Sequence, residues 1–119
     1  MELWMTTVAS ARGAQRIARE TEAAGWDGLF VVDSQNLSGD PYVALALAAT
    51  VTKRLGLGTG VTNSATRVAA ATANSITSVH RMSNGRAVLG IGRGDSALAH
   101  LGRSEEHTSE LQSPYVISY

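Results

Sequence analysis

Apolar and polar positions alternate along the chain in a pattern that repeats. Short runs rich in valine, leucine and isoleucine occupy residues 2–8, 28–32, 55–61 and 86–91. Their length and β-branched content are typical of buried strands. Each of the first three runs is followed by a longer stretch with apolar residues at helical spacing. The sequence therefore predicts a strand–helix unit that recurs along the chain.

The ends of the predicted helices carry start and stop residues. Ser10 is expected to cap a first helix that ends near Gly25, because glycine readily adopts the left-handed conformation that stops a helix. Asp40-Pro41 predicts the start of a second helix, with an apolar surface that continues to Thr52. A third helix is expected over residues 68–82.

Strands that alternate with helices predict a parallel sheet with helical crossovers. Two architectures fit this order of elements. One is an open, doubly wound sheet, and the other is part of a (β/α)8 barrel.

Polar residues gather directly after the predicted strands. Asp33 and Ser34 follow the second strand, Thr62 and Asn63 follow the third, and residues 93–96 follow the fourth. Because parallel α/β folds bind ligands at the carboxyl ends of their strands, these residues predict a ligand site at that edge. Each residue alone also has an ordinary interpretation, such as a helix cap for Asp33 or a turn for Asn63.

Two glycine patterns add to this picture. Glycines recur at every second position from 56 to 60, so they lie on one face of a strand that a bulky group or another backbone must approach closely. Residues 90–94 read Gly-Ile-Gly-Arg-Gly after a strand, where backbone amides are available to a phosphate. A Rossmann dinucleotide-binding domain is a less favoured alternative, because Asp95 stands where that fingerprint requires glycine.

Composition narrows the function classes. The 119 residues suit one small domain, and 10 basic residues balance 10 acidic ones, so no field attracts nucleic acid or an anionic membrane. The chain has no cysteine, and no metal-ligand spacing stands out, so no metal site is expected. No apolar run approaches the roughly 20 residues of a membrane span, and the first residues do not resemble a signal peptide. We therefore expect a cytoplasmic protein without membrane or nucleic-acid partners.

Three segments together resemble a known family. Residues 22–33, 57–67 and 84–96 are similar in order and spacing to the bacterial-luciferase-like flavin- and deazaflavin-dependent oxidoreductases. Within that family they look most like the branch related to methylenetetrahydromethanopterin reductase. The resemblance implies the N-terminal half of a (β/α)8 TIM barrel, with about four units in the order 1-2-3-4 and helices on one face only.

The resemblance also implies an activity and a site. It implies an oxidoreductase or monooxygenase that moves hydride between coenzyme F-420 or FMN and a small organic substrate, and a full-length protein that forms a homodimer. Asp33 and Ser34 would be the catalytic residues, facing the coenzyme ring or the substrate. The implied coenzyme-binding residues are Gly60, Val61, Thr62, Asn63, Gly92, Arg93, Gly94 and Asp95. A cis peptide or a bulge is expected at Gly60-Val61.

The chain departs from the family pattern at two places. Ser34 stands where many relatives have histidine, and Val68-Ala69 stands where many have His-Pro. These differences count against a proton relay based on histidine.

The last residues are expected to be foreign to this domain. Residues 103–113 read RSEEHTSELQS, which resembles the translation of a widely used short-read sequencing adapter. The alternative is a genuine polar helix. We therefore expect a partial barrel domain at residues 1–102 and a non-native tail at 103–119. The full-length parent is expected to be an enzyme, and this truncated chain is expected to be an inactive α/β fragment.

Overall fold

A five-stranded sheet with the strand order β1-β2-β3-β4-β5 organises the chain. The computed structural model describes residues 1–34, 38–93 and 115–118. The strands are β1 Trp4–Val8, β2 Gly28–Val32, β3 Gly56–Asn63, β4 Ala87–Gly92 and β5 Tyr115–Ser118. The first four pair in parallel, in the predicted order. Strand β5 pairs with β4 in the antiparallel direction, which the sequence did not predict.

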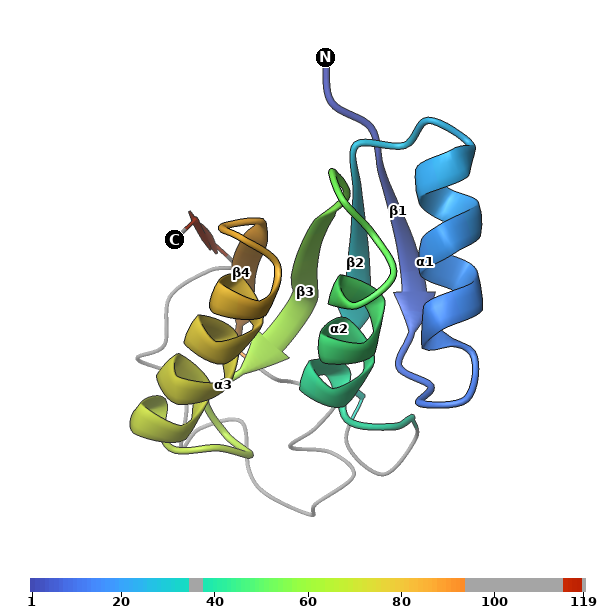
Figure 1. Ribbon diagram of the computed structural model, residues 1–119. Helices are drawn as coiled ribbons and strands as arrows, with labels where there is room; N and C mark the ends of the chain where they lie inside the picture. The colour runs from blue at the N-terminus through green and yellow to red at the C-terminus, as the bar shows by residue number, and fades with distance from the viewer. Residues whose placement is uncertain (35–37, 94–114, 119) are drawn as a thin grey trace.

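The helices are α1 Ala14–Ala23, α2 Pro41–Ala49 and α3 Ala69–Met82. All three lie on one face of the sheet, with α2 between α1 and α3 (Figure 1). A doubly wound sheet would place helices on both faces, so this arrangement is that of consecutive units of a barrel. The fold class predicted from the sequence is confirmed for these four units.

The helix starts agree only in part with the predicted caps. Asp40 caps α2 as expected, since its Oδ1 accepts hydrogen bonds from the amides of Tyr42 and Val43 at 2.7 and 3.2 Å. The expected Ser10 cap was wrong by one turn: the N-cap residue of α1 is Gly13. The Ser10 hydroxyl instead accepts a hydrogen bond from the Gly13 amide at 3.2 Å and orders the turn before the helix.

The core lies between the sheet and the three helices. Its largest fully buried side chains include Leu29, Leu45, Leu57 and Ile76. Each such side chain stabilises the fold by roughly 1.5–3 kcal/mol relative to an exposed one.

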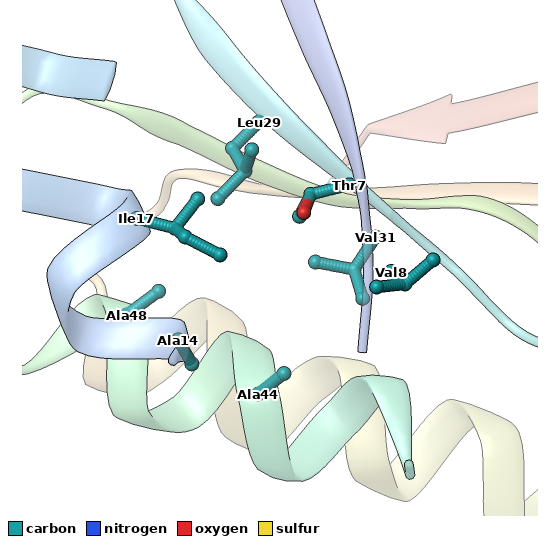
Figure 2. Close-up of a pocket in the computed structure, with 8 residues that line it drawn as sticks. All are labelled: Thr7, Val8, Ala14, Ile17, Leu29, Val31, Ala44 and Ala48. Carbon is teal, nitrogen blue, oxygen red and sulfur yellow. The ribbon is translucent and has the colours of Figure 1, made fainter. Parts of the chain in front are cut away.

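A pocket interrupts this core between β1, β2, α1 and α2 (Figure 2). It encloses about 210 Å³, part of which is open to solvent, and its one polar side chain is that of Thr7. The other lining residues are Val8, Ala14, Ile17, Leu29, Val31, Ala44 and Ala48. Ala44 and Ala48 are buried here, so part of the apolar surface expected on the second helix faces the core.

The opposite face of the sheet carries the glycines of β3. A Cβ atom on Gly58 or Gly60 would lie 2.9 or 2.8 Å from Phe30, and one on Gly28 or Gly56 would lie 2.2 or 2.6 Å from the ring of Trp4. The Trp4 and Phe30 rings stack with their centroids 4.4 Å apart. The bulky group expected over this face is therefore the chain's own aromatic pair. A coenzyme ring would have to lie farther along β3, beyond Gly60.

The amino ends of the strands are held by hydrogen bonds to the backbone. Arg86 donates to the carbonyl oxygens of Ser83, Leu55 and Thr52 at 2.7, 2.6 and 2.9 Å, and to the Thr52 hydroxyl at 2.8 Å. The Glu22 carboxylate accepts from three successive amides, at residues 53–55. These two side chains fix the loop that leads into β3.

Candidate functional site

Strand β3 changes its geometry near its carboxyl end. The Gly60-Val61 peptide is cis, and the register with β4 shifts between Thr59 and Thr62. A cis peptide or a bulge was expected at this position from the family resemblance, and β3 has the cis peptide together with a register shift. The Thr59 side chain stabilises the irregular pairing, because its Oγ1 donates to the Gly90 carbonyl at 2.8 Å and accepts from the Gly90 amide at 3.0 Å.

The kinked segment buries its neighbours and exposes one apolar side chain. Thr59 and Thr62 are fully buried and Asn63 is 3% exposed, whereas Val61 is 41% exposed. Val61 Cγ1 lies 3.4 Å from the place of a Cβ on Gly90. Ala87 and Leu89 in β4 point into the core, toward the helices. Side chains alternate along a strand, so a Cβ on Gly90 would point to the opposite face of the sheet. Val61 thus presents an apolar surface on the open face of the sheet, which is the face opposite the helices, and at the carboxyl edge, where the strands end.

Behind this edge, on the helix side, a buried carboxylate joins β2 to β3. Thr62 Oγ1 donates to Asp33 Oδ2 at 2.7 Å, and Arg67 Nη1 donates to the same oxygen. The Asp33 side chain is only 2% exposed and that of Arg67 is 17% exposed. A carboxylate so deeply buried requires a cation, and Arg67 supplies it.

Arg67 also contacts the start of α2. Its Nη2 lies 3.3 Å from Asp40 Oδ2, while the other oxygen of Asp40 caps the helix. The guanidinium carbon lies 5.0 Å from the centroid of the Tyr42 ring, within the range of a cation–π interaction. Burial alone would lower the pKa of Arg67, but the hydrogen bond and charge of Asp33, with the charge of Asp40, raise it.

Two further polar side chains complete the cluster. Asn63 Oδ1 accepts hydrogen bonds from the amides of Ala65 and Thr66 and from the Thr66 hydroxyl, and so folds the turn that leads to Arg67. The buried Tyr42 hydroxyl makes no hydrogen bond of normal geometry within the described residues. Burial raises the pKa of Tyr42, although Thr62 and Arg67 act in the opposite direction.

The structure brings together part of the site that the sequence predicted. Gly92 is the register partner of Asn63, so the ends of β3 and β4 meet as expected. Asp33 faces Arg67 on the helix side, and Ser34 is half-buried with its carbonyl accepting from the Ser38 amide at 3.0 Å. Arg93 is half-buried at the end of β4. Gly94 and Asp95 lie outside the described residues.

Sequence reasoning missed the central role of Arg67 and Tyr42. A basic residue four positions after Asn63, with two aspartates free to pair with it, was the available indication. Nothing in the sequence showed that Asp33 and Asp40 would converge on one guanidinium.

Two absences apply to the part of the chain that the structure describes. No group of three or more His, Asp or Glu side chains there is arranged to hold a metal ion. No helix there is long and apolar enough to cross a membrane.

The fold and site together define a class of protein, the parallel α/β barrels. In this chain the polar residues and the irregular part of β3 lie at the carboxyl edge of the sheet. A model of the luciferase-like monooxygenase family matches residues 2–112. The chain belongs to this family of oxidoreductases.

Individual relatives agree with this assignment. The chain is 45% identical over 80 residues to 5,10-methylenetetrahydromethanopterin reductase of Methanolobus tindarius. This alignment covers 67% of the chain and 24% of the relative. Among solved structures, the coenzyme F-420-dependent tetrahydromethanopterin reductase of Methanopyrus kandleri matches with a TM-score of 0.78 and 28% identity, over 85% of the chain and 30% of that protein. A monooxygenase of Streptomyces bottropensis shares the fold, with a TM-score of 0.77 and 23% identity, over 91% of the chain and 38% of that protein. The chain thus spans about a quarter of the length of the curated relative.

Proposed function

We propose that the full-length protein transfers hydride between a bound coenzyme, F-420 or FMN, and a small organic substrate at the carboxyl edge of this sheet. The observation that carries the proposal is the exposed Val61 in an otherwise buried segment at the carboxyl end of β3. An apolar side chain presented at this edge is suited to pack against one face of a flat ring. The similarity to reductases, one of which is named as dependent on F-420, favours the deazaflavin.

The residues present fit such a group. Trp4 and Phe30 fill the open face of the sheet as far as Gly60. A coenzyme ring at the carboxyl edge would therefore rest on Val61, with Phe30 next to it on the side toward the amino ends of the strands. When bound, the coenzyme supplies the hydride chemistry. The role of this chain is to bind the ring, orient it and exclude water from one of its faces. Ser34, which is half-buried, remains a candidate to direct a polar group toward coenzyme or substrate, whereas the buried Asp33, Thr62 and Asn63 would act by holding the supporting segment in place.

The proposal is tested by purifying the full-length protein, recording the absorbance of any copurified coenzyme, and titrating the coenzyme-free protein with F-420 and FMN. We expect binding of one of them and a loss of affinity of at least roughly tenfold in Val61→Glu, because a carboxylate would be desolvated against the ring. Leu3→Glu is the matched control: Leu3 is 53% exposed, but it lies next to the amino end of β1. Failure of the wild-type protein to bind either coenzyme would overturn the proposal.

We also propose that the full-length protein is a homodimer that buries the outer surface of α3 and the start of α2. Val43, Val68 and Met82 are 49%, 73% and 50% exposed. Ala69, Ala70, Ala71 and Ala73 are exposed on the same helix as Met82. Isolated apolar residues are common on surfaces, but a group of this kind favours an interface. Val68→Glu is expected to convert the dimer to a monomer in sedimentation at micromolar concentration.

Residues 103–119 are proposed to be foreign to the native gene. This proposal rests on the adapter-like sequence RSEEHTSELQS alone. Sequencing the gene from intact genomic DNA tests it: a native codon sequence through position 119 would overturn it.

A further inference from the structure

We propose that Arg67 is a positioning residue for the coenzyme-supporting segment 60–63, and that it acts through the carboxylate of Asp33. This inference rests on the function proposed above. Arg67 itself lies behind the edge, on the helix side, and its guanidinium is engaged by two aspartates and the Tyr42 ring. It therefore affects the ring site only through the groups that it holds.

The link from Arg67 to β3 passes through a single atom. Asp33 Oδ2 accepts from both Thr62 Oγ1 and Arg67 Nη1. Without the guanidinium, a carboxylate that is 2% exposed would be buried without a cation, and it would rotate toward solvent. Rotation removes the acceptor that fixes the Thr62 side chain. Thr62 adjoins Val61, so the apolar surface at the edge would shift with it.

Arginine is suited to this position because its planar fork serves two carboxylates at once. One nitrogen binds Asp33 at the end of β2, and the other lies 3.3 Å from Asp40 at the start of α2. Lysine would keep the charge but has no second fixed donor. The turn held by Asn63 sets the distance between Arg67 and β3, so that both ends of the link are fixed.

Val61 presents the apolar surface that would pack against the ring, and loss of the contacts of one such side chain corresponds to about tenfold in affinity. We therefore expect Arg67→Met to weaken binding of F-420 or FMN by roughly 10-fold at a temperature where the variant is fully folded. Arg67→Lys should recover part of that loss. Arg16→Met is the matched control, since Arg16 pairs with Glu20 at 3.3 Å on an exposed surface and should bind like wild type.

The test uses the full-length protein and two readouts. The first is the dissociation constant of F-420 and of FMN, measured by fluorescence titration for the wild type and the three variants. The second needs no coenzyme: the amide chemical shifts of Thr62 and Asn63 should move in Arg67→Met, return partly in Arg67→Lys, and stay unchanged in Arg16→Met. If Arg67→Met does not fold, Arg67→Lys carries both readouts.

The outcomes separate the inference from the proposed function. Wild-type affinity and unchanged Thr62 and Asn63 shifts in the Arg67 variants would overturn the positioning role, while the proposed function would stand. Absence of F-420 and FMN binding in the wild type would overturn the proposed function itself. Weaker binding in Arg67→Met with partial recovery in Arg67→Lys would support both.

Discussion

The two edges of the sheet are each organised around one arginine, but the arginines have different acceptors. At the amino edge, Arg86 donates mainly to backbone carbonyl oxygens, those of Ser83, Thr52 and Leu55. At the carboxyl edge, Arg67 donates to the side chains of Asp33 and Asp40. Backbone acceptors cannot move without local unfolding, whereas carboxylates on short side chains can rotate. The amino edge is therefore held by main-chain acceptors, whereas the carboxyl edge depends on side-chain acceptors that one substitution can remove.

This comparison predicts that substitution of Arg86 has the largest effect on stability. Arg86→Met leaves three backbone carbonyls without their donor, and unsatisfied buried acceptors cost about 1–3 kcal/mol each when solvent cannot reach them. Because Arg86 is only half-buried, we expect a loss of about 3 kcal/mol in the free energy of unfolding, measured by urea denaturation. Coenzyme affinity of the folded variant should stay near wild type. Weaker coenzyme binding at full folding would break the proposed division between the two edges.

The next effect in size concerns the pair at the carboxyl edge. Arg67→Met is expected to lower the free energy of unfolding by about 2 kcal/mol, less than a fully buried pair would lose because Arg67 keeps some exposure. In Asp33→Asn, the loss should be similar. The double variant should lose clearly less than the sum, with a coupling energy of about 1 kcal/mol or more, since both changes remove the same contact. Additive losses would show that the two side chains do not act together.

The sequence predicted local features better than contacts between residues far apart in the chain. The order of the strands, the Asp40-Pro41 start of α2 and the special peptide at Gly60-Val61 follow from local residue patterns and from the family resemblance, and all three are confirmed. The Asp33–Arg67 contact joins residues 34 positions apart and depends on where two loops fold back. Such contacts leave no periodic pattern in one sequence.

The glycine face illustrates the same limit. Its spacing predicted a close approach, which the structure shows, but the approaching rings belong to Trp4 and Phe30. Trp4 reaches β3 across β2, a relation that only the sheet register establishes. Residue type alone therefore could not distinguish a coenzyme ring from a side chain of the protein.

A third prediction uses pH to probe the amino edge. Burial alone would raise the pKa of Glu22, but hydrogen bonds from the amides of Arg54, Leu55 and Lys53 outweigh it, so the pKa lies below the ordinary value of 4.5. A carboxyl with a lowered pKa in the folded state stabilises the protein above its unfolded pKa, and that contribution is lost as the pH falls through the folded value. Glu22→Gln should therefore reduce stability at neutral pH by less than either arginine substitution, and the difference from wild type should shrink below about pH 4.5. A difference that is constant between pH 7 and 3 would contradict this role of Glu22.

The smallest expected effect comes from the pocket beside β1. A substitution there tests whether the pocket influences coenzyme binding at the carboxyl edge. Figure 2 shows the Thr7 side chain, with its oxygen, among the apolar residues that line this pocket. Thr7→Val exchanges the hydroxyl for a methyl group of nearly the same size, which is favourable in an apolar environment. We expect the free energy of unfolding to rise by about 0.5 kcal/mol, less than the roughly 0.8 kcal/mol of a fully buried methylene because the pocket is partly open. Thr6→Val is the control: Thr6 is exposed and alternates to the other face of β1, so its substitution should leave stability nearly unchanged. Coenzyme affinity should stay unchanged in Thr7→Val, because the pocket lies on the helix side of the sheet and Val61 on the other. A change in affinity in Thr7→Val would mean that packing under α1 and α2 affects the coenzyme site. The comparison between an amino edge held by main-chain acceptors and a carboxyl edge held by side-chain acceptors would then have to include this pocket.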